Sequence, residues 1–144
     1  MSSELLNLGK SLEDYLERIL LLGLSNEKIR VTDLAIKLGV KKPSVVSALR
    51  KLAEEELIIY EKYKDIILTD KGRELAGKVY RRHLTLTRFF NEVLGIEHAQ
   101  ADADACLVEH DISLETFNRM FAFVEFIERT PEARELVEKF KKKL

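Results

Sequence analysis

Apolar residues recur at helical spacing through the first third of the chain. A stripe from Ser11 to Gly23 predicts a first helix, formed by Leu12, Tyr15, Leu16, Ile19 and Leu20. A short second helix is predicted over 31–38, with Thr32 as a plausible cap and Gly39 as its terminator. The segment KKPSVVSALRKLAEEE then predicts a third helix, with Pro43 near its start and the stripe Val45, Ala48, Leu49 and Leu52.

The helical period breaks directly after the third helix. Two runs of β-prone residues, 57–60 and 66–69, flank a polar segment that contains Lys62, Lys64 and Asp65. We expect these runs to pair as a small hairpin. Three helices followed by a two-stranded ribbon are the order of a winged helix-turn-helix domain, which we assign to residues 1–72.

From Asp70 onward the pattern is helical again. A long helix of about 20 residues is predicted up to Gly95, then a helix over 100–111, a helix capped by Ser113 and a final helix opened by Thr130-Pro131-Glu132. The third of these carries the spacing 3, 4, 3 typical of helices that pack together, in Leu114, Phe117, Phe121 and Val124. Self-association and packing inside one chain would both give this stripe. The fold class is thus mainly α, with residues 73–144 forming an all-helical domain suited to dimerisation.

Composition places the protein in the globular class. The chain has 144 residues, 46% of them hydrophobic, which is enough for a core. Its single cysteine cannot form an internal disulfide, the N-terminus lacks the pattern of a secretory signal, and no apolar run approaches a membrane span. We expect a cytoplasmic protein without a membrane partner.

Positive charge is concentrated in the helix-turn-helix. The whole chain has a net charge of −1, but the window from Lys28 to Lys51 contains seven basic residues and one acidic residue. Such a window fits the phosphate backbone of DNA. The residues expected to read bases at the start of the third helix are Lys41, Lys42, Ser44 and Ser47, with Pro43 fixing the entry of the helix, and those expected to hold the DNA backbone are Arg50, Lys51, Lys62 and Lys64. A solvated helix face is the alternative interpretation.

A group of metal-binding residue types stands in DACLVEHD. On a helix Cys106, Glu109 and His110 share one face, at positions i, i+3 and i+4. A closed site for a divalent transition metal needs further donors. His83 on the long helix and the pair Asp14 and Glu17 on the first helix are the residues that could supply them. A core histidine and acids that favour a helix N-terminus are the structural alternatives.

The order of these segments resembles that of a known family. The segments SLEDYLERILLL, VKKPSVVSALRKL, ELIIYEKYKDIILTDKG, VYRRH and CLVEHDIS together resemble the metal-dependent repressors typified by the diphtheria toxin repressor and the manganese transport regulator. The resemblance implies a homodimer that grips operator DNA when metal is bound. It also implies the ligand set Asp14, Glu17, His83, Cys106, Glu109 and His110.

The sequence is a hybrid of two branches of that family. Asp14 and Glu17 resemble the manganese branch, whereas Cys106 resembles the iron-responsive branch. Thr87 and Asp102 stand where the iron-responsive branch has further ligands, and with Leu144 as the last residue of the sequence we expect no SH3-like third domain. We expect Mn²⁺ or Fe²⁺, with Zn²⁺ or Co²⁺ as substitutes in vitro and one or two ions per subunit.

The expected function is that of a metal-dependent regulator, a repressor by resemblance, which controls metal-homeostasis genes. One ion would join the first helix to the second domain and fix the spacing of two recognition helices, about 34 Å or a multiple of it on a palindromic operator. The alternatives are a winged-helix regulator that ignores metals, with Cys106 as a small buried residue, and a helical metalloenzyme. The sequence has no Gly-rich phosphate loop, nucleophile elbow or HExxH motif, so we expect no enzyme and no small organic substrate.

Overall fold

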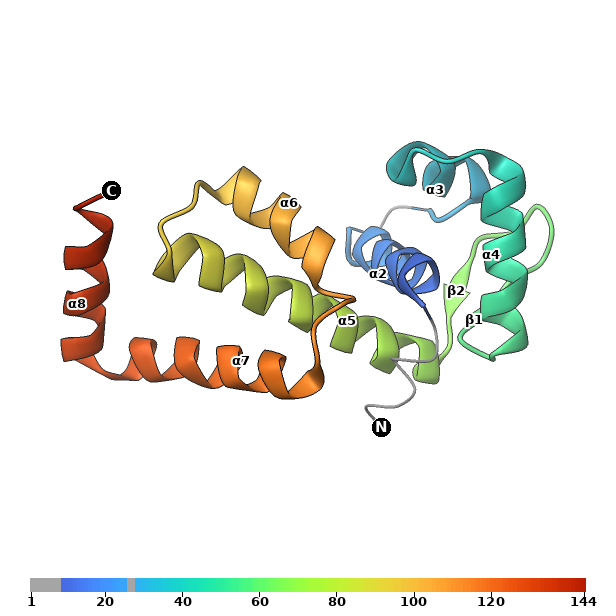
Figure 1. The fold of residues 1–144 in the computed structure, drawn as a ribbon. Coiled ribbons are helices and arrows are strands. Elements are labelled where there is room, and N and C mark those ends of the chain that lie inside the picture. Colours follow the sequence, from blue (N-terminus) through green and yellow to red (C-terminus); the bar gives the residue numbers. More distant parts are fainter. Residues whose placement is uncertain (1–8, 26–27) are drawn as a thin grey trace. The chain divides into compact units, whose positions relative to one another are not determined.

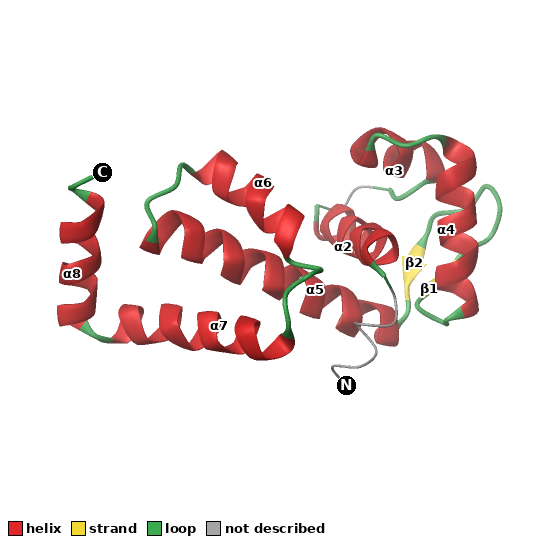
Figure 2. Ribbon diagram, viewed as in Figure 1, coloured by secondary structure: helices red, strands yellow, loops and turns green. Residues whose placement is uncertain are grey.

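The computed structural model describes residues 9–25 and 28–144, which divide into two compact units, Met1–Val79 and Tyr80–Leu144. Figure 1 shows the elements in chain order, and Figure 2 distinguishes helices from strands. They are α2 (Lys10–Leu24), α3 (Val31–Leu38), α4 (Lys42–Glu54), β1 (Ile58–Ile59), β2 (Ile67–Leu68), α5 (Asp70–Arg88), η1 (Phe89–Val93), α6 (His98–Val108), α7 (Leu114–Arg129) and α8 (Pro131–Lys141). The boundary expected between residues 72 and 73 stays a prediction, and α5 runs through both positions.

The first unit is built on one apolar core. The stripes predicted from helical spacing on α2 and α4 are buried there, together with Leu34 of α3 and the first part of α5. Burying these side chains removes apolar surface from water and is the main favourable contribution to folding of the unit. The three predicted helices of the helix-turn-helix are confirmed at nearly the predicted residues.

The start of α3 differs from the prediction. Thr32 lies inside the helix, and the N-cap is Arg30, whose backbone N–H donates to Asp33 Oδ2 at 3.0 Å. An acidic side chain three residues into the helix therefore accepts a hydrogen bond from the backbone N–H of the cap residue. Arginine itself is not among the residues that are preferred as N-caps. Gly39 ends α3 in the left-handed conformation (φ 64°), as predicted.

The predicted hairpin is present but short. Strands β1 and β2 are antiparallel, with Ile58 opposite Leu68 and Ile59 opposite Ile67. Thr69 fixes the next turn because its hydroxyl donates to Glu56 O at 2.6 Å and accepts from the backbone N–H of Gly72 at 3.0 Å. A Cβ at Gly72 would lie 1.8 Å from the carbonyl oxygen of Leu57, so only glycine fits there.

The second unit consists of packed helices. The long helix that begins with α5 ends in a π-helical turn, η1, which helical periodicity did not predict. Gly95 follows with φ 75°. Helices α6 and α7 both contact η1, and α7 contacts α8. A small apolar cluster of Val93, Val124 and Ile127 lies between these elements.

The stripe predicted on α7 is only partly buried. Ser113 caps this helix by accepting from the backbone N–H of Thr116 at 3.1 Å, as predicted. Val124 is buried, but Leu114 and Phe121 are exposed, as are their neighbours Phe123 and Phe126. Packing inside one chain therefore accounts for Val124 but not for the exposed apolar residues of α7. A helix face of this kind is suited to covering by another protein surface.

Candidate metal centre and nucleic-acid interface

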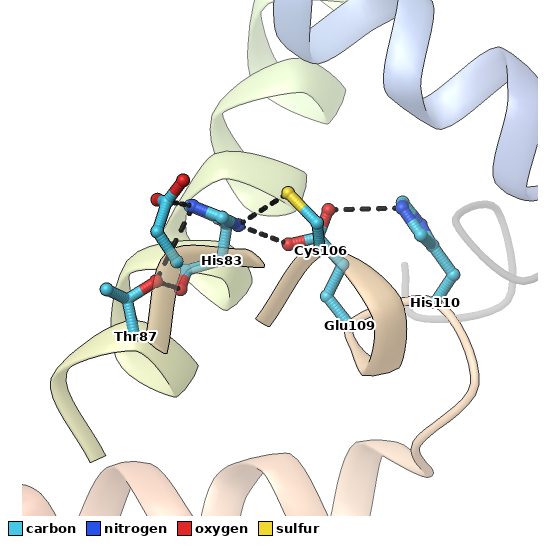
Figure 3. A network of polar contacts seen from close by, with 6 residues as sticks. His83, Thr87, Cys106, Glu109 and His110 are labelled. Atoms are coloured by element: carbon cyan, nitrogen blue, oxygen red, sulfur yellow. Dashed lines mark hydrogen bonds and ion pairs between the residues drawn. The ribbon is translucent and has the colours of Figure 1, made fainter. Parts of the chain in front are cut away.

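Three side chains of the second unit converge. His83 lies on α5, Cys106 lies on α6, and Glu109 is the C-terminal cap of α6 (Figure 3). One ligand atom from each lies within 4.8 Å of the other two. The Sγ atom of Cys106 is 3.7 Å from His83 Nδ1. This convergence brings together residues more than twenty positions apart in the sequence.

Glu109 is the most buried member of the group, with 1% of the residue exposed. Its Oε2 atom is 2.8 Å from His83 Nδ1, and its Oε1 atom is 3.1 Å from His110 Nε2 (Figure 3). Oε1 is thus within ion-pair distance of His110, but it is a buried oxygen with no hydrogen-bond partner among the described residues. A buried polar atom left in this state is costly unless another partner satisfies it.

The charge state of Glu109 follows from opposing influences. Burial is the largest and by itself would raise the pKa, because it disfavours the charged carboxylate. Contacts with His110 and His83, and the positive charge of these rings, together outweigh burial and lower the pKa below its ordinary value. Glu109 is therefore an ionised carboxylate at neutral pH, which is the form that binds a metal.

His83 contacts carboxylates through both ring nitrogens. Its Nε2 atom is 2.7 Å from Oδ1 of Asp102, opposite the Nδ1 atom that faces Glu109. The hydroxyl of Thr87 donates to the backbone carbonyl of His83 at 2.9 Å. Asp102 was not among the predicted site residues, although it lies at i, i+4 and i, i+7 from Cys106 and Glu109 on the same helical face. That spacing was the signal that could have identified it.

The end of α6 differs from the predicted helix over 100–111. The helix begins at His98 and ends at Val108, so Glu109 is its cap and His110 lies in the following turn. Glu109 keeps helical dihedral angles (φ −58°, ψ −27°), and it remains on the same side as Cys106. The side chain of His110 is 2% exposed. Cys106, Glu109 and His110 therefore do not all lie on one regular helix.

The two remaining predicted ligands lie in the first unit. Asp14 and Glu17 stand one turn apart on α2, and Glu17 is buried. Whether they join the donors of the second unit stays a prediction.

The residues of the second unit fit a divalent transition metal. They offer a thiolate, an imidazole nitrogen and an ionised carboxylate, which are ligand types that iron, zinc and cobalt accept readily. The buried Oε1 atom of Glu109 has no hydrogen-bond partner among the described residues, and a bound cation would supply a partner for it. Cys106 is exposed, which does not fit the alternative of a small buried apolar residue.

A basic surface lies on the first unit. All nine predicted DNA-contacting residues are exposed, and most lie on or just before α4. A surface groove along this helix is lined by Lys42, Pro43, Val46, Ser47, Arg50, Lys51 and Glu54. Exposed basic side chains on the second helix of a helix-turn-helix are placed to meet DNA phosphates.

The hairpin turn presents one exposed aromatic residue that was not among the predicted DNA-contacting residues. Tyr63 is 85% exposed and has a left-handed backbone (φ 67°), and Lys62 Nζ lies 5.1 Å from its ring centroid. Lys64 pairs with Glu61, and this hydrogen bond and charge raise the pKa of Lys64 and lower that of Glu61. Part of the positive charge expected at the wing is thus offset by a neighbouring acid.

Comparison with known proteins finds two family models that match successive parts of the chain. The model of the iron dependent repressor N-terminal DNA binding domain matches residues 7–66, and that of the iron dependent repressor metal binding and dimerisation domain matches residues 69–137. An uncharacterized HTH-type transcriptional regulator of Methanocaldococcus jannaschii is 39% identical over 82% of this chain and 95% of its own. The HTH-type transcriptional regulator MntR of Listeria welshimeri is 35% identical over 87% of each chain.

The fold is also found among solved structures. The manganese regulator SloR superposes with a TM-score of 0.70 and 31% identity over 80% of this chain. The aligned region is 54% of that protein, so the chain spans about half the length of this solved relative.

Together these findings define a winged-helix DNA-binding protein with a helical metal-binding and dimerisation domain. The chain belongs to the iron-dependent repressor family of metal-dependent transcriptional repressors, which confirms the resemblance to the diphtheria toxin repressor and the manganese transport regulator. Its relatives bear the names of transcriptional regulators. None of the helices that the structure describes is long and apolar enough to span a membrane.

Proposed function

We propose that the protein binds double-stranded operator DNA as a homodimer when Asp14, Glu17, His83, Cys106, Glu109 and His110 hold a divalent transition metal. The observation that carries this proposal is the convergence of His83, Cys106 and Glu109 around a buried carboxylate oxygen without a hydrogen bond. The proposed role is regulatory and not catalytic, and the proposed setting is the cytoplasm.

The ligand set explains how metal would affect DNA binding. Asp14 and Glu17 belong to α2 of the DNA-binding unit, and the other four donors belong to the second unit. When bound, the cation supplies positive charge that offsets the clustered carboxylates. Residues of both units that share one ion would restrict motion between the units. Recognition helices with a fixed spacing in the dimer lose less conformational freedom on binding two half-sites.

The donors favour iron(II) and manganese in different ways. Cys106 supplies a soft thiolate, which suits iron(II), zinc and cobalt, whereas the carboxylates of Asp14, Glu17 and Glu109 also suit manganese. Mn²⁺ or Fe²⁺ is therefore the proposed physiological ion, with one or two ions per subunit. Relatives in this family include a manganese regulator, which supports the first of these metals.

The direct test is DNA binding with and without metal. The protein is titrated onto a fluorescent duplex from its own upstream region, at one fixed salt concentration, with Mn²⁺, Fe²⁺, Zn²⁺ or chelator. Coupling of this kind is typically worth about 1–3 kcal/mol, or roughly 5–150-fold in affinity. We expect tightening in this range for the wild type and none for Glu109→Gln. By linkage, the operator must tighten metal binding by the same factor.

Asp111→Asn is the matched control, because it removes an exposed carboxylate two residues from Glu109. This variant is expected to respond to metal as the wild type does. Equal DNA affinities of the wild type in metal and in chelator would exclude the proposed switch. Salt is held constant because phosphate contacts alone make DNA affinity depend strongly on ionic strength.

A further inference from the structure

Asp102 contacts His83 but lies outside the proposed ligand set. It stands on α6, and its Oδ1 atom is 2.7 Å from His83 Nε2. Its side chain is 53% exposed, so water reaches this side of the ring. The opposite side of the ring faces the buried Glu109 and the thiol of Cys106.

The contact fixes which ring nitrogen keeps its hydrogen when a metal binds. Carboxylates accept hydrogen bonds, so the metal-free ring can donate through Nε2 to Asp102 and through Nδ1 to Glu109. A ring nitrogen that binds a metal must give up its hydrogen. Nδ1 faces the candidate ligands Cys106 and Glu109, so it is the nitrogen placed to bind the metal, and Nε2 keeps its hydrogen for Asp102.

The two sides of the ring differ in the donors they offer. Near Nδ1 are a thiol and a buried carboxylate, whereas near Nε2 are Asp102 and the hydroxyl of Thr87, 3.5 Å away. That hydroxyl gives its hydrogen to the backbone carbonyl of His83, and threonine is a poor metal ligand. The groups near Nε2 therefore suit a hydrogen bond that holds the ring in place rather than the binding of a second ion.

We propose that Asp102 is a positioning residue, which orients His83 and commits its Nδ1 atom to the metal. This inference rests on the proposed function, because it assumes that His83 is a ligand. A hydrogen bond donated by the second ring nitrogen of a metal-bound histidine to a carboxylate fixes the tautomer and raises the basicity of the ring. Asp102 acts on the metal only through His83.

The test measures metal binding and the state of the ring, without DNA. Asp102→Ala removes the acceptor, and Asp102→Asn keeps the shape and an acceptor oxygen but removes the charge. Asp104→Asn is the matched control, because it removes a carboxylate from the same helix that pairs with Gln100 and not with His83. Far-ultraviolet circular dichroism of the metal-free proteins checks that each variant is folded.

Zinc affinity is measured by competition with a chromophoric chelator, and the number of ions per subunit by native mass spectrometry. We expect Asp102→Ala to weaken zinc binding by about 10–100-fold, the range found for such partners. Asp102→Asn should lose less zinc affinity than Asp102→Ala, and Asp104→Asn should bind zinc as tightly as the wild type. Long-range ¹H–¹⁵N correlation spectra of the zinc-loaded protein report the ring state, and the three histidines of the chain make assignment simple.

In the wild type we expect His83 to show a zinc-bound Nδ1 and a hydrogen on Nε2, and in Asp102→Ala we expect this single state to be lost. Unchanged affinity and ring state in Asp102→Ala would overturn the inference alone. So would loss of a second ion from this variant with the remaining ion bound as tightly as before, because Asp102 would then be a ligand. If the wild type bound no metal at all, both this inference and the proposed function would fail.

Discussion

The two units of this protein differ in the size of the apolar core they form. In the first unit apolar side chains of α2, α3, α4 and the start of α5 pack into one continuous core. In the second unit the buried cluster is small, and large apolar side chains such as Phe123 and Phe126 are exposed on α7. The first unit buries the stripes predicted on α2 and α4, whereas the second leaves much of the stripe on α7 exposed. This difference fits a DNA-reading unit joined to a dimerisation unit.

The charged groups follow the same division. Basic side chains of the first unit face solvent along α4, ready for an external polyanion. In the second unit the carboxylates of Glu109 and Asp102 contact the ring nitrogens of His83. One unit therefore presents its charge outward, and the other directs it toward a candidate metal centre.

The largest expected effect comes from breaking the core of the first unit. Leu49 is fully buried, so Leu49→Ala should lower the free energy of unfolding by about 2–5 kcal/mol through lost burial and a residual cavity. Urea denaturation followed by circular dichroism measures this change. Ile36→Ala, at a 74% exposed position of the same unit, should change it by less than about 0.5 kcal/mol. Equal losses in the two variants would mean that the first unit lacks the closed core described above.

Metal is expected to stabilise the protein by a similar amount through the second unit. A ligand that binds only the folded state, at about 100 times its Kd, adds about 2.7 kcal/mol to the free energy of unfolding. Thermal unfolding with and without Mn²⁺ measures the gain in stability. Hydrogen exchange should show the added protection near α5 and α6. Glu109→Gln should show little of it. A metal-induced gain that survived this substitution would place the ion elsewhere.

A smaller effect is expected on self-association. Phe126 is 56% exposed in the single chain, and full burial of such a side chain contributes about 1.5–3 kcal/mol. Phe126→Ala should therefore raise the dimer Kd at least about tenfold, with little change in the helical content of the subunit. Analytical ultracentrifugation over a dilution series measures the Kd. An unchanged dimer would show that the α7 face is not part of the interface.

The smallest expected effect is on the salt dependence of DNA binding. Each phosphate contact contributes about 0.9 to the slope of log affinity against log salt concentration, so Arg50→Ala should lower the slope by about that amount. Metal affinity in the absence of DNA should stay unchanged, because Arg50 lies on the exposed face of α4. The control is Lys139→Ala, which removes a positive charge from α8 of the second unit. A slope reduced equally by both substitutions would point to general charge rather than to the α4 surface.

Much of the fold could be predicted because the signals were local. Buried positions such as Val45, Leu49 and Leu52 recur at helical spacing, and Gly39 and Ser113 mark helix ends through their own backbone and side-chain chemistry. The π-helical turn and the Arg30 cap were not predicted, since both depend on how the backbone is satisfied in the folded chain.

The sequence by itself determined the order of elements, the basic character of α4 and which residue types could bind a metal. These follow from periodicity and from the chemistry of single side chains. Only the tertiary structure decided that the α7 stripe is only partly buried, that Glu109 keeps a buried oxygen without a hydrogen bond, and that Asp102 lies against His83. Such contacts join residues far apart in the chain, and a pattern that repeats every few residues carries no information about them.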